Sequence, residues 1–373
     1  MSGNATVRFL HSADWQLGMT RHWLGEHQGA YDRARVGAIR RIGELAAEQG
    51  CEFVLVCGDV FEHAQVKPRT AEPVLERLGA LPVPVYLLPG NHDPLTESGI
   101  YRSAWFREQA GPGVHVLDRP GLSEVRPGVE LLAAPWFGKQ APAEQIDRLA
   151  ARLDPPPPGT VRIAVGHGGV DSLASALTAD PVSTAALEAA VAQGRVHYVA
   201  LGDRHSKLSV GASGRIWYSG SPEPTATRDP DPGHVLVVEL APDRAPEVTP
   251  HRVATWTFKE RYFELNEPQD VDAVFGWLDA FPEKADTVAK PILSGALGLA
   301  ESERLRAGLE SRAHRFAAIL ESGRSTLRIR PQDTDLDDLA LTGFVAEAAA
   351  ALRDQGGEHA NEALRLLVRL AGA

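Results

Sequence analysis

The sequence predicts an α/β fold built around a largely parallel sheet. Strand-like and helix-like segments alternate through the first hundred residues. Polar side chains follow directly after several of the predicted strands. The chain has 373 residues, of which 43 % are hydrophobic, so it can bury a sizeable core and is long enough for two or three domains.

The first part of the chain carries the clearest pattern. The predicted elements are, in order, a strand over 6–13, a helix over 30–49, a strand over 52–56, a helix over 69–79 and a strand over 83–88. The first helix is predicted because Val36, Ile39 and Ile42 fall near one helical face, and Gly50 is a suitable residue to end it. Strand–helix–strand connections of this kind cross over with a right hand, and ligands bind at the carboxyl ends of the strands.

The pattern resumes after a proline run at 155–158, which we interpret as a loop. Strands are predicted over 161–165 and 196–201. Short strands over 216–219, 234–240 and 248–253, with turns rich in Gly, Pro and Asp, predict an antiparallel second sheet.

From residue 256 the chain predicts a small α+β unit. Its expected elements are a strand over 256–265, a helix over 270–281, a strand over 288–293, a helix over 302–321 and a strand over 325–330. An acidic linker at 333–338 follows. Two amphipathic helices are expected after it, one marked by the stripe Leu341, Val345, Ala348 and Leu352 and one over 362–371.

Composition narrows the functional classes. The formal net charge of −11 excludes a globally basic nucleic-acid coat, so a polyanion would have to bind through a local patch, a metal ion or a partner. No apolar run approaches the ~20 residues of a membrane helix, and the N-terminus lacks a secretory signal pattern. Two cysteines, Cys51 and Cys57, cannot form a disulfide framework. We therefore expect a cytoplasmic protein with no membrane partner.

The candidate metal-binding and catalytic residues are a set of polar residues at strand ends or in Gly-flanked turns. Its members are Asp14, Asp59, Asn91, His92, His167, Asp203 and His205. Carboxylates, an amide oxygen and imidazoles together suit two divalent ions and favour Mn²⁺, Fe or Mg²⁺ over a thiolate zinc site. Two such ions about 3.5–4 Å apart clamp a phosphate and generate a bound hydroxide.

The order and spacing of these motifs resemble the calcineurin-like metallophosphoesterases. Within them, the sequence is most similar to the SbcD-like DNA-repair exonucleases, the nuclease subunits of complexes with an SMC-type ATPase. The matching motifs lie at 11–18, 58–61, 90–93, 166–167, 201–205 and 218–222. The resemblance implies a four-layer sandwich of two sheets flanked by helices. It implies a catalytic domain over 1–255, an α+β capping domain over 256–332 and a C-terminal helical partner-docking segment over 333–373.

The resemblance also implies residue roles. One metal would be held by Asp14, Gln16, Asp59 and His205, and the other by Asp59, Asn91, His167 and Asp203, with Asp59 bridging. His92 would be a catalytic residue that contacts the scissile phosphate, and Asp93 would orient it.

Two positions depart from the family pattern, which usually has histidine where this chain has Gln16 and Asp203. The exchange removes two imidazoles and adds one negative charge, which hardens the site toward Mn²⁺ or Mg²⁺. Mn²⁺ is the expected ion, with Mg²⁺ and Fe as alternatives. The same departures leave reduced catalysis open.

The resulting expectation is a two-metal DNA nuclease that works with an SMC-like coiled-coil ATPase in double-strand break repair, with a homodimer as an open alternative. A small-molecule phosphodiesterase or phosphatase of the same superfamily is the competing enzyme hypothesis. A scaffold subunit with weakened catalysis is the competing non-enzymatic one.

Overall fold

The computed structural model describes residues 6–173, 180–329 and 343–357, together with 359–360, 363–364 and 366–367. The chain divides into two compact units, Met1–Thr257 and Phe258–Ala373. Each is described by itself.

The first sheet of unit 1 has six strands in the order β12-β11-β1-β2-β3-β4. Their bounds are β1 Val7–Ser12, β2 Phe53–Cys57, β3 Val85–Leu88, β4 Val114–Val116, β11 His234–Leu240 and β12 Glu247–Arg252. Strands β1 to β4 pair in parallel, while β11 joins β1 and β12 joins β11 in antiparallel pairs. The strands β1 and β2 are almost fully buried, as expected for strands covered on both faces.

The second sheet also has six strands, in the order β5-β6-β7-β8-β10-β9. Their bounds are β5 Gly121–Arg126, β6 Val129–Ala133, β7 Val161–His167, β8 Tyr198–Gly202, β9 Leu208–Val210 and β10 Ile216–Tyr218. Strands β6, β7, β8 and β10 are parallel, and β5 and β9 are antiparallel edge strands.

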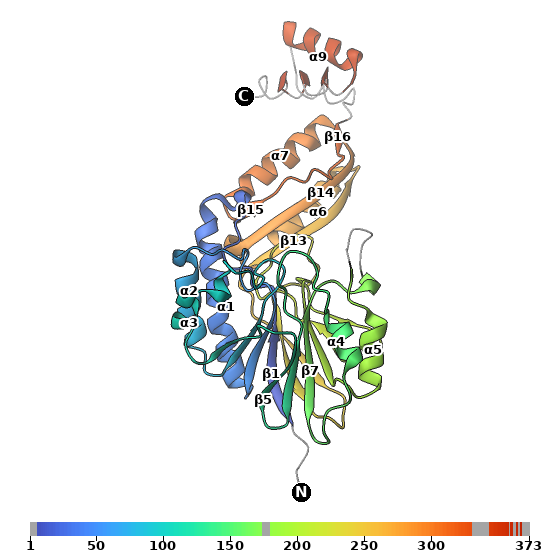
Figure 1. Ribbon diagram of the computed structural model, residues 1–373. Coiled ribbons are helices and arrows are strands. Elements are labelled where there is room, and N and C mark those ends of the chain that lie inside the picture. Colours follow the sequence, from blue (N-terminus) through green and yellow to red (C-terminus); the bar gives the residue numbers. More distant parts are fainter. Residues whose placement is uncertain are drawn as a thin grey trace. The chain divides into compact units, whose positions relative to one another are not determined.

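Helices cover the outer face of each sheet (Figure 1). The helices α1 Gln28–Glu48, α2 Pro68–Gly79 and α3 Ala104–Gln109 pack on the first sheet, and α4 Ile146–Arg152 and α5 Thr184–Ala192 pack on the second. Short 3-10 turns occupy His22–His27, Ile100–Arg102 and Asp171–Leu173. Between the sheets lies an apolar layer that includes Phe9, Phe53 and Ile163. Helix, sheet, sheet and helix form four layers, which confirms the predicted fold class.

The prediction that 216–219, 234–240 and 248–253 form a separate antiparallel sheet is wrong. Strand β10 extends the second sheet in parallel beside β8, whereas β11 and β12 extend the first sheet. The central strand β1 is bonded to β2 on one edge, and β11 returns to satisfy its other edge. Strands β4 to β6 and helices α3 to α5 were not predicted from the sequence.

Unit 2 contains a four-stranded sheet and its helices. The elements are β13 Thr257–Leu265, which begins at the unit boundary, α6 Pro268–Asp279, a 3-10 turn Lys284–Asp286, β14 Thr287–Leu297, α7 Leu299–Ala313, β15 Ala318–Ile319 and β16 Arg328–Ile329, followed by α9 Phe344–Gln355. The predicted helix over 302–321 is too long. The helix α7 ends at Ala313, because Phe316 is buried and Ala318 and Ile319 pair with β14.

The C-terminal segment contacts its own unit where it is described. Ala349 and Leu352 of α9 pack with Leu299 and Leu364. At the start of α9, Phe344 is 82 % exposed. The predicted linker at 333–338 and Leu341 lie outside the described residues, and the predicted helix over 362–371 is described only at 363–364 and 366–367.

Two further expectations can be compared with the structure. Cys51 and Cys57 are both buried and neither forms a disulfide. Among the residues that the structure describes, none of the helices has the length and apolar character required to cross a membrane.

Candidate metal centre

The predicted site residues come from the carboxyl ends of parallel strands in both sheets. Asp14 and Asp59 follow β1 and β2, which are neighbours in the first sheet. His167 ends β7, and Asp203 follows β8, its neighbour in the second sheet. Because the two sheets pack face to face, these four residues reach a common edge of unit 1.

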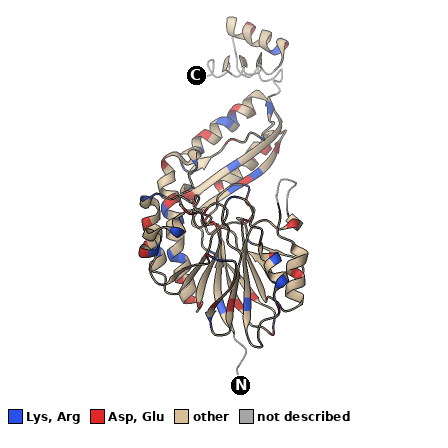
Figure 2. Cartoon of the chain, in the orientation of Figure 1, with Lys and Arg blue, Asp and Glu red and all other residues tan. Residues whose placement is uncertain are grey.

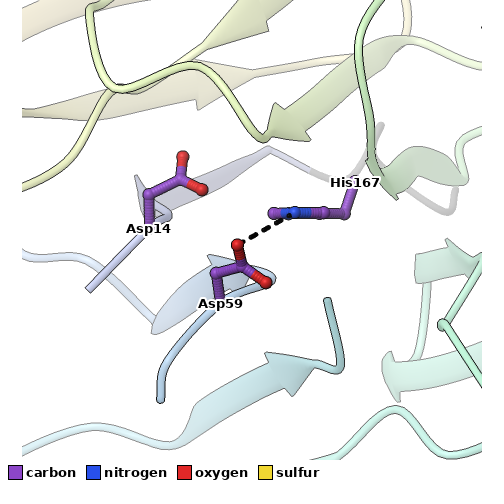
Figure 3. Close-up of side chains that lie close together, drawn as sticks. All are labelled: Asp14, Asp59 and His167. Atoms are coloured by element: carbon purple, nitrogen blue, oxygen red, sulfur yellow. Dashed lines mark ion pairs between the residues drawn. The ribbon is translucent and has the colours of Figure 1, made fainter. Parts of the chain in front are cut away.

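Asp14, Asp59 and His167 form the centre of the site (Figure 3). One ligand atom from each lies within 4.8 Å of the others, and all three side chains are buried. The Asp59 Oδ2 atom is 3.4 Å from His167 Nε2. Two carboxylates and an imidazole at this separation are a suitable donor set for a hard divalent ion.

His167 is oriented toward this centre by its other ring nitrogen. Its Nδ1 donates to the Cys57 carbonyl at 2.8 Å, which directs Nε2 at the carboxylates, as commonly found for metal-ligating histidines. Nε2 also lies 2.8 Å from Asn91 Oδ1 and 4.0 Å from Asp203 Oδ1. Adjacent ligands of an octahedral ion at 2.0–2.1 Å are separated by about 3 Å. His167 Nε2 thus lies near the three other residues predicted for the second ion. Among the described His, Cys, Asp and Glu side chains, however, the group that closes to metal-binding separation is Asp14, Asp59 and His167, without Asp203.

The backbone at the site is strained. The backbone φ angles of Asp14, Asp59 and Asp203 are 54°, 55° and 99°. Residues other than glycine rarely adopt positive φ values. Hydrogen bonds hold them there. The Asp14 amide donates to the Gly58 carbonyl at 3.0 Å, and the Asp203 amide donates to the Asp14 carboxylate at 3.1 Å. Strain concentrated on polar residues at one edge is typical of a functional site.

Two glycines are required by close approach. A Cβ atom on Gly202 would lie 1.8 Å from the Cys57 carbonyl oxygen and 2.8 Å from His167 Nδ1. A Cβ atom on Gly90 would lie 2.2 Å from Asp59 Oδ1. Any side chain at either position would displace a predicted ligand, which explains why glycine stands beside them.

The electrostatics of the cluster favour a bound cation. Burial raises the pKa of Asp14 to about 7. Burial also opposes ionisation of Asp59, yet His167 and His92 hold the pKa of Asp59 below its usual value. For His167, burial alone would lower the pKa, but Asp59, Asp14 and Asp203 raise it well above the usual range. Buried carboxylates in excess over histidines would be offset by a divalent ion.

His205 interacts electrostatically with Asp14 and contacts Gln16. The Gln16 amide nitrogen is 3.1 Å from His205 Nε2. The His205 Nδ1 atom bonds the Thr225 hydroxyl, which donates to Asp229 at 3.0 Å. Burial alone would lower the pKa of His205, but the carboxylates of Asp229, Asp14 and Asp203 raise it. The chain Asp229–Thr225–His205 therefore directs Nε2 at Gln16, so the two predicted ligands contact one another.

Placing histidine at positions 16 and 203, as in the resembled family, is expected to change which divalent ion the protein prefers. In the double variant Gln16→His with Asp203→His, Zn²⁺ binding should tighten relative to Mg²⁺, because imidazole favours later transition metals than carboxylate or amide oxygens do. Calorimetric titration of the variant and the wild-type protein measures the ratio. Gln145→His, at another buried glutamine, is the control. An unchanged order of preference would mean that these side chains do not reach the metals.

His92 lies beside the cluster without its ring joining it. The His92 amide donates to Asp59 Oδ1 at 3.0 Å, while its ring Nδ1 donates to the Glu62 carbonyl at 3.1 Å. The side chain is 37 % exposed and lines a cavity of about 830 Å³ together with Asn91. The ring nitrogen Nε2 is therefore the one available to a bound phosphoester.

The structure gives partners other than the His92 ring to the Asp93 carboxylate, which was expected to orient that ring. The Asp93 carboxylate accepts hydrogen bonds from the amides of Phe61 and Gly90, at 3.0 and 2.8 Å, and from the Tyr101 hydroxyl at 2.6 Å. Burial raises the pKa of Asp93 to about 6. Asp93 thus joins the loops after β2 and β3.

Several residues that contact the site were missed by sequence reasoning. Glu62 orients His92, Thr225 and Asp229 orient His205, and the buried Arg35 guanidinium donates to the carbonyls of Trp15 and Gln16. A signal existed for Thr225 alone, since it closely follows the motif at 218–222. The other contacts join loops that share no local pattern.

Comparison with known proteins identifies a matching family and a curated relative. The family model described as calcineurin-like phosphoesterase matches residues 7–276, which is more than half of the chain. The DNA double-strand break repair protein Mre11 of Archaeoglobus fulgidus is 33 % identical over 93 residues, which cover 23 % of this chain and 19 % of that protein. The chain thus matches only about a fifth of the length of this curated relative.

Two solved structures are among those found to be similar. The protein TT1561 of Thermus thermophilus is 11 % identical, with a TM-score of 0.40, over 67 % of this chain and 100 % of that one. The calcineurin-like phosphoesterase YfkN from Bacillus subtilis is 13 % identical, with a TM-score of 0.38, over 67 % of this chain and 91 % of that one. On the match of the family model to residues 7–276, the chain belongs to the calcineurin-like phosphoesterase family, whose members are metal-dependent hydrolases.

Proposed function

We propose that this protein is a metal-dependent nuclease that hydrolyses phosphodiester bonds of DNA. The observation that carries the proposal is the buried cluster of Asp14, Asp59 and His167, with His92 beside it on the wall of an open cavity. Membership of a phosphoesterase family supports the reaction class. The partial similarity to a DNA double-strand break repair protein supports DNA as substrate.

The chain's own residues divide into two tasks. Asp59, Asn91, His167 and Asp203 would hold one divalent ion, and Asp14, Gln16 and His205 would join Asp59 around a second. The ions would neutralise phosphate charge and supply the hydrolytic nucleophile. His92 would donate a hydrogen bond or a proton from Nε2 to the phosphoester. Since its Nδ1 already donates to a carbonyl, Nε2 can donate only when the ring is an imidazolium.

One observation favours a second candidate, a subunit with weakened catalysis. Gln16 and His205, which would share an ion, are hydrogen-bonded to each other instead. Among the described His, Cys, Asp and Glu side chains, the group that closes to metal-binding separation contains Asp14, Asp59 and His167, and His205 is not in it. An ion on the His205 side must break the contact with Gln16, which weakens its binding.

Other parts of the functional hypothesis stay predictions from the resemblance. These are Mn²⁺ as the ion in the cell, a cytoplasmic location, an SMC-like ATPase partner bound through 333–373, and a homodimer.

Diester specificity tests the proposal. With Mn²⁺, the full chain should hydrolyse bis(para-nitrophenyl) phosphate and cleave labelled DNA oligonucleotides, and it should hydrolyse para-nitrophenyl phosphate, a monoester, more slowly. Chelation with EDTA should abolish all three activities. Preferential hydrolysis of the monoester would make the protein a phosphatase. Inactivity toward every ester, with Mn²⁺ bound, would favour the scaffold.

A further inference from the structure

A groove lined by α1, α2 and the loop after β2 leads away from the cavity that contains His92. The groove has a volume of about 760 Å³, and the cavity beside it has about 830 Å³. The two share Glu62, His63 and Gln65 on their walls, so they lie side by side. We propose that this groove binds the phosphate backbone of the single strand that leads to the scissile bond, an inference that rests on the proposed nuclease function.

The charge of the groove is opposite to that of the chain. Its lining carries five cationic side chains, Arg33, Arg35, Lys67, Arg69 and Arg77, against two carboxylates, Asp32 and Glu62. The chain as a whole has a formal net charge of −11. Figure 2 shows basic and acidic residues intermixed over both units. The groove is therefore a local basic patch of the kind that a polyanion requires on an acidic protein.

Four of these cations are free to meet a ligand. Arg33, Lys67, Arg69 and Arg77 are exposed, and within the described part of the chain none of them forms an ion pair with a carboxylate. Several other arginines of unit 1 are paired with carboxylates, as in Arg126 with Glu52, Arg148 with Asp180 and Arg162 with Glu130. Unpaired cations gathered in one groove repel one another, and an anionic ligand would relieve that repulsion.

The spacing of the cations suits a polymer. On α2, Arg69 and Arg77 are eight residues apart, with Pro73 between them on the same face and in the groove lining. Eight residues of helix span about 12 Å. A span of about 12 Å is longer than a single phosphate group, so Arg69 and Arg77 would contact different nucleotides of one strand.

The test is binding of DNA in the absence of divalent ions, so that cleavage does not interfere. The variant carries Lys67→Glu, Arg69→Glu and Arg77→Glu in the full chain. The probe is a fluorescent single-stranded oligonucleotide of about 20 nucleotides, long enough for a typical single-strand site. Anisotropy is recorded with EDTA between about 50 and 200 mM salt, because affinity without a salt series is not interpretable.

The expected result has two parts. The variant should bind at least about tenfold more weakly at low salt. The slope of log K against log salt should become shallower by about 2, from three lost phosphate contacts at ~0.7 each on a single strand. A control variant with the same charge change outside the groove, Arg119→Glu, Arg152→Glu and Arg244→Glu, should bind like wild type. If charge reversal prevents folding, glutamine at the same three groove positions replaces it.

The outcomes separate this inference from the proposed function. If wild type cleaves bis(para-nitrophenyl) phosphate but the groove variant binds the oligonucleotide as wild type does, the groove inference is overturned and the nuclease proposal stands. If wild type cleaves no phosphodiester, the nuclease proposal fails whatever the groove binds. If the groove variant alters the oligomeric state and leaves DNA affinity unchanged, the groove is a contact between copies of the chain.

Discussion

Replacing His92 with alanine is expected to slow cleavage of DNA about 10²–10⁴-fold and to leave metal affinity close to wild type. The ring lines the cavity beside Asn91, and only the backbone amide of His92 contacts the Asp59 carboxylate. Loss of the ring removes a donor to the phosphoester but leaves Asp14, Asp59 and His167 in place. Calorimetric titration with Mn²⁺ and single-turnover cleavage measure the two quantities separately.

Two substrates show how His92 acts. The sugar oxygen released when DNA is cleaved is a poor leaving group that needs a proton, whereas para-nitrophenolate leaves without one. A general acid therefore predicts a larger loss for DNA than for bis(para-nitrophenyl) phosphate, and charge stabilisation predicts equal losses. The exposed His314 of unit 2, changed to alanine, is the control. A variant of His92 that loses its metal, with activity falling in proportion, would make His92 a ligand.

Much of the site could be predicted because it depends on local signals. A buried strand that leads to a polar residue beside glycine is visible in the sequence, as at Asp59 and His167. The rule that parallel strands present their carboxyl ends at one edge then brings these residues together. The strand β11 also matched its predicted bounds, since a short run of valines and leucines bounded by turn residues is typical of a buried strand.

The parts that could not be predicted depend on pairing between distant segments. The sheet to which β11 belongs is decided by hydrogen bonds to β1, more than two hundred residues earlier, and no local pattern encodes that choice. The helix α7 stops early because β14 captures Ala318 and Ile319, a case of tertiary pairing overriding helix propensity. The same holds for Asp93, whose partners Phe61 and Tyr101 lie in different loops.

Asp59 and Asp93 provide a matched pair of buried carboxylates with opposite expected effects. In Asp59→Asn, the stabilisation by Mn²⁺ should largely disappear, because the carboxylate nearest His167 Nε2 is lost from the cluster. A ligand present at 100 times its Kd stabilises the native state by about 2.7 kcal/mol. For a domain of this size that corresponds to a rise in Tm of about 5–10 °C, which wild type should show and Asp59→Asn should not.

In Asp93→Asn, we expect a lower basal stability and an unchanged response to Mn²⁺. The new amide group faces one of the backbone N–H donors of Phe61 and Gly90, so one buried hydrogen bond is lost and the free energy of unfolding should fall by about 1–3 kcal/mol. Its rise in Tm with Mn²⁺ should persist, because Asp93 contacts the backbone and Tyr101 rather than the ligand cluster. Thermal unfolding with and without Mn²⁺ measures both variants in one experiment. A full Mn²⁺ response in Asp59→Asn would remove Asp59 from the metal site, and a lost response in Asp93→Asn at unchanged basal stability would place Asp93 in it.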